Sequence, residues 1–209
     1  ARAQRPRGRL PAPQARAMSR PPILLETARM FLRELRPDDL NRLLALDQDP
    51  EVMRFISKGI PTSRAMYEND YLPRMLSYQN QAPPRGFWAA HLHDGGEFIG
   101  WFHLRPDKIT PEEMELGYRL ARNVWGRGLA TEGAQALVEK GLGEWGYDKI
   151  SARTLVNNLA SQRVMQKAGL VFESEFCFPA ELLPDWTPEE RRAVKYSRTR
   201  RQREEPLEA

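Results

Sequence analysis

Short apolar-rich segments bounded by turn residues predict β-strands along much of this chain. In the first of them, Met30 and Leu32 alternate with other residues and share one face. Asp94, Gly95 and Gly96 form a turn signal that joins two later segments into a hairpin. The predicted strands span residues 29–35, 87–93, 97–104, 113–120, 149–156, 170–176 and 194–200.

Apolar residues at helical spacing predict four helices between these strands. The first opens at Pro37, has acidic residues in its first turn and ends before Pro50. Pro73 should kink or divide the second, because proline lacks the backbone N–H that a helix interior needs. Gly169 closes the last one. After the first, the predicted helices span residues 63–79, 129–145 and 159–168.

The order of these elements indicates a mixed α/β domain. Three strands follow one another between residues 87 and 120, which is typical of an antiparallel meander. From residue 129 onward helices and strands alternate, which favours a βαβ unit.

The composition excludes several classes of protein and site. Apolar residues make up 41% of the chain, enough for one core, and no run of about 18 apolar residues predicts a transmembrane helix. Cys177 is the single cysteine and cannot form an internal disulfide. His91, His93 and His103 fall in strand-like segments without zinc-ligand spacing, so we expect no metal site. A chain without an internal disulfide suits a reducing compartment, so we expect a cytoplasmic location.

The positive charge is concentrated at the N-terminus. Residues 1–22 hold six arginines and no acidic residue, which leaves 26 cations against 28 acids in the rest of the chain. This composition predicts a disordered basic leader over 1–22, a folded domain over 23–200 and a flexible tail over 201–209. A basic leader can also bind nucleic acid or a membrane surface.

A candidate phosphate site lies where a predicted strand leads into the third helix. Gly126-Arg127-Gly128 precedes the helix that starts at Leu129, and glycines allow successive backbone N–H groups to point into one small space. The helix N-terminus adds free N–H groups and positive potential, so such a corner binds phosphate. Thr131 adds a hydroxyl and Arg127 a cation. The alternative is an ordinary tight turn between strand and helix.

A second group of polar residues follows the strand over 149–156. Asn158 is well placed to cap the next helix, as asparagine commonly does. The functional alternative is that Asn158 and Ser161 line a cleft that opens at the end of that strand.

Two ordered motifs together resemble the GNAT superfamily of N-acetyltransferases. They are Trp-Gly-Arg-Gly-Leu-Ala-Thr-Glu over 125–132 and, one helix and one strand later, Asn-x-x-Ser-x-x-Val-x-x-Lys-x-Gly-Leu over 158–170. The segment Phe31–Leu40 is similar to the start of the branch that acetylates ribosomal-protein N-termini (RimJ/RimL-like). The resemblance covers residues 23–200. It implies a central mixed, mostly antiparallel sheet of six to seven strands flanked by about four helices.

The resemblance also implies where acetyl-CoA, the cosubstrate, binds. The pantetheine arm should run beside Arg119 to Arg122, and a β-bulge should splay that strand from residues 149–156 so that the thioester lies in the gap. Trp125 stands where the family has glutamine or arginine, which leaves the backbone cradle as the phosphate site. The implied cosubstrate-binding residues are Leu120, Ala121, Arg122, Trp125, Gly126, Arg127, Gly128, Leu129, Ala130, Thr131, Asn158 and Ser161.

Proton transfer needs a base for the amine and a donor for the leaving thiolate. Many family members have a tyrosine donor where this chain has Met165, so Ser161 or water is the expected donor. Glu115 is the first candidate for the base, because Gly117 beside it should leave open space for an amine. Further candidates are Glu113 on the same strand face and Glu181 in the loop before the last strand, whereas Glu132 is expected to be structural and Tyr118 a core aromatic or a substrate-orienting residue.

The expected activity is transfer of an acetyl group from acetyl-CoA to a primary amine by direct attack. The acceptor is a protein N-terminus or a small-molecule amine. Two alternatives are a non-catalytic relative that binds acyl-CoA and a ribosome- or nucleic-acid-associated protein that uses its basic leader. We expect a monomer or homodimer, no membrane partner and no nucleic-acid partner.

Overall fold

The protein is described here by a computed structural model over residues 22–204. Its centre is one eight-stranded sheet in the order β1-β2-β3-β4-β5-β6-β8-β7. Neighbouring strands are antiparallel except β5 and β6, which are parallel and joined by helix α5, as the predicted βαβ unit requires. The strands are β1 (Ile23–Glu26), β2 (Met30–Glu34), β3 (Gly86–Leu92), β4 (Phe98–Pro106), β5 (Met114–Leu120), β6 (Lys149–Leu155), β7 (Val171–Cys177) and β8 (Arg192–Thr199).

The mixed, mostly antiparallel sheet is confirmed, with one strand more than the six to seven expected. The additional strand is β1, whose four residues are too few to show a clear alternation in the sequence. The helices are α1 (Leu40–Asp47), α2 (Pro50–Ser57), α3 (Arg64–Met66), α4 (Leu72–Leu76), α5 (Leu129–Leu142), α6 (Leu159–Lys167) and α7 (Arg200–Glu204), with short turns η1 (Pro37–Asp39), η2 (Tyr67–Tyr71) and η3 (Arg122–Val124).

Two prolines shape the helical region between β2 and β3. Pro50 ends the first predicted helix, but it also begins α2, which the sequence did not reveal. Asp49 caps α2 by accepting a hydrogen bond from the N–H of Glu51, and proline suits the first turn because its missing N–H needs no partner there. The predicted second helix is divided into α3, the π-helical turn η2 and α4, with Pro73 in the first turn of α4.

The two ends of the chain lie partly outside the described residues. The leader predicted over 1–22 falls there except for Pro22. A flexible tail was predicted over 201–209, but its first residues are helical: α7 extends to Glu204, and Arg203 donates to Glu139 at 3.0 Å. Within residues 22–204, no helix has the length and apolar content needed to cross a membrane.

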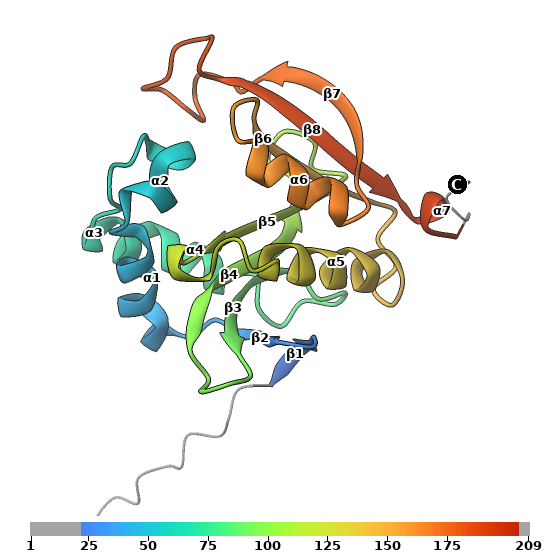
Figure 1. Cartoon of the computed structure of the whole chain (residues 1–209), viewed down its shortest axis with the longest axis horizontal. Helices are drawn as coiled ribbons and strands as arrows, with labels where there is room; N and C mark the ends of the chain where they lie inside the picture. Colours follow the sequence, from blue (N-terminus) through green and yellow to red (C-terminus); the bar gives the residue numbers. More distant parts are fainter. Residues whose placement is uncertain (1–21, 205–209) are drawn as a thin grey trace, which may run out of the picture.

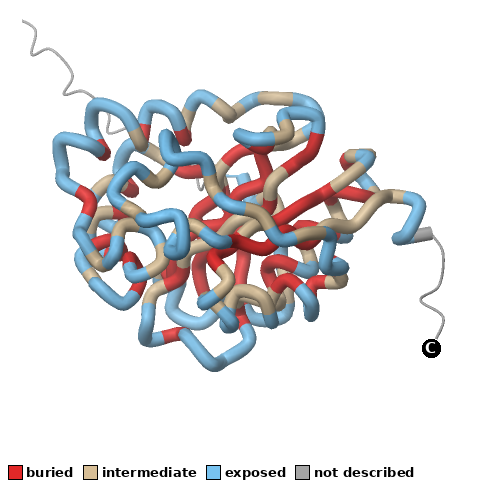
Figure 2. The backbone as a smooth tube through the Cα atoms, turned by 90° about the horizontal axis from the view of Figure 1, so that it is seen from above, coloured by how far each residue is buried: buried red, intermediate tan, exposed pale blue. Residues whose placement is uncertain are grey.

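Helices cover the two faces of the sheet and create two buried clusters (Figures 1 and 2). Helix α5 packs on one face, where Leu137 and Val138 contact sheet residues such as Phe102. Helices α1, α2 and α4 pack on the other face against Trp101 and Ala89. Successive residues of a strand therefore point alternately toward these two layers.

Strands β5 and β6 part soon after they begin. Their pairing is limited to Met114 with Ile150 and Glu115 with Ser151. The splay that the family resemblance implied is therefore present, but the expected bulge in β5 is not. Strand β5 stays in unbroken register with β4 up to Leu120, while β6 stays paired with β8 along its whole length. The two strands diverge because β5 stays paired with β4 and β6 stays paired with β8.

Candidate active site

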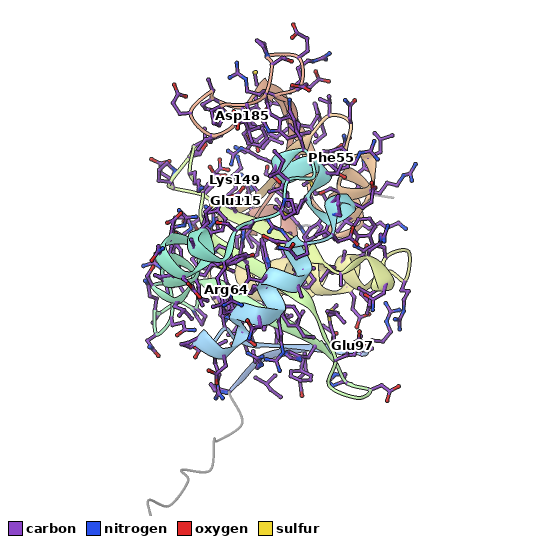
Figure 3. The ribbon with its side chains drawn as sticks, turned by 90° about the vertical axis from the view of Figure 1, so that its left-hand side faces the viewer. Phe55, Arg64, Glu97, Glu115, Lys149 and Asp185 are labelled. Atoms are coloured by element: carbon purple, nitrogen blue, oxygen red, sulfur yellow. The ribbon has the colours of Figure 1, made fainter. Side chains whose placement is uncertain are left out.

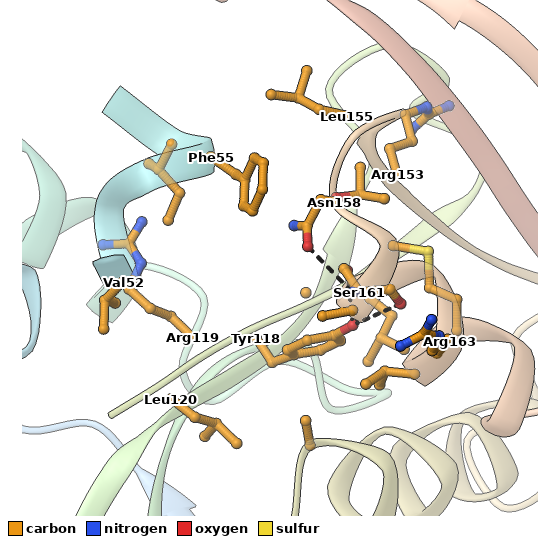
Figure 4. A pocket seen from close by; sticks show the side chains of 18 of the residues that line it. Val52, Phe55, Tyr118, Arg119, Leu120, Arg153, Leu155, Asn158, Ser161 and Arg163 are labelled. Atoms are coloured by element: carbon orange, nitrogen blue, oxygen red, sulfur yellow. Dashed lines mark hydrogen bonds between the residues drawn. The ribbon is translucent and has the colours of Figure 1, made fainter. Parts of the chain in front are cut away.

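A cavity of about 840 Å³ opens where β5 and β6 part (Figure 4). Its walls are the second half of β5, the end of β6 and the first turns of α6. The remaining sides are formed by α2, the N-terminus of α5 and the loop between β7 and β8. The cavity coincides with the gap in which the resemblance places the thioester.

The loop that leads into α5 presents unpaired backbone N–H groups to this cavity. Gly126 and Gly128 have positive φ angles of 72° and 78°, and Gly128 is the N-cap of α5 with no side-chain cap. The N–H of Glu132 donates to the carbonyl of Gly128, so the N–H groups before it have no acceptor within the helix. A Cβ added at Gly126 would meet no atom within 4 Å, so there is room for a ligand. A loop of this kind at a helix N-terminus can accept an anionic group such as a phosphate.

Side chains on both sides of this loop hold it in position. The indole N–H of Trp125 donates to the carbonyl of Leu120 at 2.8 Å, which ties the loop to the end of β5. Arg29 donates to the carbonyl of Arg127 at 2.7 Å and pairs with Glu132 at 2.6 Å. Glu132 also accepts hydrogen bonds from the turn between β1 and β2, so its structural role is confirmed.

Most of the predicted cosubstrate-binding residues line the cavity. Three do not: Ala121, Arg122 and Arg127. Ala121 packs on the α1–α4 side of the sheet, and Arg122 pairs with Asp49 at 3.0 Å. Arg127 contributes its carbonyl to the contact with Arg29. The residues that the structure brings together are Leu120, Trp125, Gly126, Gly128, Leu129, Ala130, Thr131, Asn158 and Ser161.

Asn158 and Ser161 fit both interpretations of their motif. The Asn158 side chain accepts a hydrogen bond from the N–H of Ser161 at 3.2 Å and so caps α6. Both residues also line the cavity (Figure 4). Met165, one turn later, is buried and lines it as well.

Tyr118 reaches across the gap between β5 and α6. Its hydroxyl lies 2.9 Å from Ser161 Oγ and donates to the Ser161 carbonyl at 3.3 Å. Burial raises the pKa of Tyr118 to about 12, so the hydroxyl keeps its proton at neutral pH. The ring packs against the α5 side of the core, as expected of a core aromatic. The contact with Ser161 was not predicted, because nothing in the sequence shows how closely α6 approaches β5.

Glu115 lines the cavity on the opposite face of β5, beside Arg105 of β4. Its carboxylate lies 2.5 Å from the Arg105 guanidinium and 3.9 Å from His103 Nε2. Burial raises the pKa of Glu115, while Arg105 and Lys108 oppose that shift. The Glu115 side chain is 19% exposed, so its carboxylate is largely removed from solvent.

The open space expected beside Gly117 is absent. His103 lies directly across from Gly117 on β4, and a Cβ at Gly117 would come within 2.4 Å of its ring. The ring also stacks on Trp101 and contacts Phe87 edge-on. Burial holds the pKa of His103 well below its usual range, so the ring is neutral. Sequence alternation could not reveal a neighbour that fills the space from another strand.

The other two candidate bases lie away from the cavity lining. Glu113 pairs with Lys149 and Lys195 at 2.9 Å on the β6–β8 side. Burial acts to raise its pKa, but these lysines lower it overall. Glu181 is exposed and does not line the cavity, although its loop does contribute Phe178, Leu182 and Leu183.

A buried carboxylate of α1 anchors β5 from the α1–α4 side. Asp47 is fully buried and accepts hydrogen bonds from Thr62, Tyr67 and Arg119 at 2.6, 2.9 and 2.5 Å. Arg119 lies over the Trp101 ring at 5.1 Å and lines the cavity. The only signal in the sequence is an acidic residue at an apolar position of the predicted helix. Among residues 22–204, no cluster of His, Cys, Asp and Glu is suited to a metal ion.

Comparison with known proteins shows which sequences and structures this chain is similar to. Residues 29–171 match the sequence family described as an acetyltransferase (GNAT) domain. The chain is 31% identical over 185 residues to the FsC-acetyl coenzyme A-N(2)-transacetylase of Aspergillus fumigatus, covering 84% of this chain and 76% of the relative.

Two solved structures share the fold at low sequence identity. The RimL ribosomal L7/L12 alpha-N-protein acetyltransferase in complex with coenzyme A has a TM-score of 0.68 at 16% identity, covering 85% of this chain and 98% of that one. The spermidine N-acetyltransferase of Vibrio cholerae in complex with CoA and spermine has a TM-score of 0.67 at 15% identity, covering 84% and 98%. The two scores are nearly equal, so the fold does not single out the RimJ/RimL-like branch.

Proposed function

Because the chain belongs to the GNAT family of N-acetyltransferases, we propose that it moves the acetyl group of acetyl-CoA to a primary amine in the cavity between β5 and β6. The observation that carries this proposal is the convergence of three features on one cavity. These are the glycine loop at the N-terminus of α5, the hydroxyl pair of Tyr118 and Ser161, and the buried carboxylate of Glu115.

The glycine loop is the proposed binding site for the diphosphate of acetyl-CoA. Backbone N–H groups with no intrahelical partner and the positive end of α5 attract its negative charge. When bound, acetyl-CoA supplies the thioester that the amine attacks. Trp125 and Arg29 position the loop through Leu120 and Arg127, and neither is required as a direct phosphate ligand.

Glu115 is the proposed base that removes a proton from the acceptor ammonium, so that the neutral amine attacks the thioester. Its carboxylate lines the cavity, and burial raises its pKa, which makes it a better proton acceptor once it is deprotonated. His103 is buried beneath Gly117 and does not itself line the cavity, so Glu115 is the better candidate.

The hydroxyl pair of Tyr118 and Ser161 is the proposed donor to the leaving thiolate. Met165 cannot donate a proton, but the two hydroxyls 2.9 Å apart lie across the gap and can pass one between them. In the reaction the new N–C bond forms and the C–S bond breaks. The proton that the nitrogen loses as the amide forms leaves through Glu115 to solvent, the thiolate sulfur takes a proton from the hydroxyl pair, and solvent returns a proton to that pair.

The acceptor is proposed to be either a protein N-terminus or a small-molecule amine. The name of the A. fumigatus relative denotes an N(2) nitrogen as its acceptor, which supports a primary amine on a small molecule. Membership of the RimJ/RimL-like branch would support a protein N-terminus. We also propose that residues 23–200 suffice for catalysis, which a protein consisting of residues 23–200 alone tests directly.

The experiment for this function is an acceptor screen with purified protein and acetyl-CoA. Amino acids, polyamines, aminoglycosides and peptides with free N-termini are incubated with the enzyme, and mass spectrometry detects a gain of one acetyl group. Release of CoA without an acetylated product, or no reaction with any amine, would contradict the proposal.

A further inference from the structure

The side of the cavity remote from the glycine loop is lined by four cations and three carboxylates. We call this region the acceptor end. It is formed by α2, the end of β4, the turn between β4 and β5, and the loop between β7 and β8. Figure 3 labels two residues of its lining, Phe55 and Glu115. Its charged lining residues are Glu51, Arg54, Arg105, Asp107, Lys108, Glu115 and Arg153.

The carboxylates of the acceptor end already have cationic partners. Asp107 forms a buried ion pair with Arg153 and accepts two backbone hydrogen bonds. Glu115 pairs with Arg105 at 2.5 Å. Glu51 is exposed and lies 3.9 Å from Arg54. No carboxylate of this region therefore remains free to bind a second cationic group of a substrate.

Lys108 is the cation of this region that has no counter-ion. Across residues 22–204, no carboxylate lies within ion-pair distance of its ammonium. Burial lowers the pKa of Lys108, and the neighbouring guanidinium groups of Arg105 and Arg74 lower it further, whereas the carboxylates of Glu115 and Asp70 oppose this shift. An anion bound beside Lys108 and Arg105 would offset this repulsion.

We infer that the acceptor is an amine that carries a carboxylate, of the amino-acid class, and that Lys108 and Arg105 bind this carboxylate beside Glu115. This inference rests on the proposed function. The arrangement puts the amine next to Glu115, since an α-amino group and its carboxylate lie on the same carbon.

Binding of a carboxylate would also change Glu115. Arg105 divides its charge between Glu115 and the substrate when both are present, so its lowering effect on the Glu115 pKa is weakened. A carboxylate with a higher pKa is the stronger base. The substrate's own anionic group would thus strengthen the base that deprotonates its amine.

The uncharged lining of the acceptor end is largely apolar. Ile109 and Leu182 are 40% and 39% exposed, and Phe55 and Phe178 line the same region. These side chains suit an apolar substituent on the acceptor, which makes L-leucine a suitable probe. A polyamine suits this lining poorly, because its additional ammonium groups would face Arg105 and Lys108.

The test compares L-leucine, L-leucinamide and spermidine as acceptors at one pH. Leucinamide has a neutral carboxamide in place of the carboxylate, and spermidine adds positive charge. Because the α-amine of leucinamide is also less basic, kcat/KM is referred to the concentration of unprotonated amine for each acceptor. We expect kcat/KM to be at least about tenfold higher for leucine than for leucinamide, the scale of one charge-assisted hydrogen bond, and lowest for spermidine.

Variants assign the effect to Lys108. Lys108→Gln should lower kcat/KM for leucine by about tenfold and leave leucinamide within about twofold, since only leucine has the group that Lys108 binds. Lys140→Gln is the matched control, because Lys140 lies on α5 and pairs with Glu144 outside the cavity. Melting temperatures verify that both variants are folded.

The outcomes separate this inference from the proposed function. Acetylation of leucinamide or spermidine at a rate equal to or above that of leucine would overturn the inference and leave the acetyltransferase activity intact. An equal loss for leucine and leucinamide in Lys108→Gln would also overturn it. If acetyl-CoA raises the melting temperature but no amine in the wider screen is acetylated, the proposed function itself is wrong, and the inference falls with it.

Discussion

Replacing Tyr118 with phenylalanine tests the hydroxyl pair directly. The substitution removes the oxygen that lies 2.9 Å from Ser161 Oγ and 3.3 Å from the Ser161 carbonyl. The ring keeps its packing against Phe102, since their centroids are 5.9 Å apart and no atom of that contact is lost. The perturbation is therefore confined to one hydroxyl.

The structure sets the expected size of two effects. Loss of one partly buried hydrogen bond should lower the free energy of unfolding by about 1 kcal/mol. Loss of a proton donor should lower kcat by about 10²-fold, which corresponds to roughly 2.7 kcal/mol in the barrier. Stability and turnover thus change by clearly different amounts, and the KM for acetyl-CoA should change little.

A double variant distinguishes a shared role from two separate roles. Because Tyr118 and Ser161 are bonded to each other, the double variant Tyr118→Phe/Ser161→Ala should be about as slow as the slower single variant. Tyr147→Phe is the matched control, since Tyr147 donates to the carbonyls of Pro83 and Pro84 outside the cavity.

The assay is steady-state release of CoA with one accepted amine, between pH 6 and about 10. Burial raises the pKa of Tyr118 to about 12, so the donor stays protonated and the rate should not fall at the alkaline end of this range. A kcat within about threefold of the unmodified protein in Tyr118→Phe would refute the role of this hydroxyl. So would fully multiplicative losses in the double variant.

Three further predictions concern other parts of the site. Glu115→Gln should lower kcat/KM by about 10²-fold without weakening acetyl-CoA binding. In the unmodified protein, kcat/KM should fall as the pH drops through the pKa of Glu115, which burial raises above 4.5, and a pH–rate profile that the substitution leaves unchanged would exclude Glu115 as the base. Gly128→Asp should abolish the rise in melting temperature that acetyl-CoA causes, because a carboxylate would repel the diphosphate; a retained rise in thermal shift would argue against the glycine loop. Asp47→Ala should lower the free energy of unfolding by about 3 kcal/mol, because it leaves Arg119 without its buried counter-charge, and a urea titration within about 0.5 kcal/mol of the unmodified protein would contradict this.

Local patterns in the sequence were sufficient for most of the elements. Seven of the eight strands and two of the helices that flank the cavity, α5 and α6, follow from apolar spacing, turn residues and caps. The glycine loop could also be predicted from the sequence, because Gly126 and Gly128 adopt positive φ angles that other residues rarely tolerate. These features depend on residues close together in the chain, so they can be predicted from the sequence without knowledge of the tertiary structure.

Contacts between distant segments could not be read in the same way. The pairing of Tyr118 with Ser161, of Glu115 with Arg105 and of Asp47 with Arg119 depends on how α1, β4 and α6 approach β5. Charged and hydroxyl residues occur throughout the chain, and nothing in their local spacing selects one partner over another.

The sequence by itself therefore determined most of the elements in their order, the glycine loop before α5 and the family of the protein. Only the tertiary structure decided that His103 fills the space over Gly117, that β5 and β6 part without a bulge in β5, and that Lys108 forms no ion pair within residues 22–204. The physical reason is range: backbone preferences and periodicity act over a few residues, whereas packing and electrostatic pairing are set by the positions of elements that the chain brings together only when it folds.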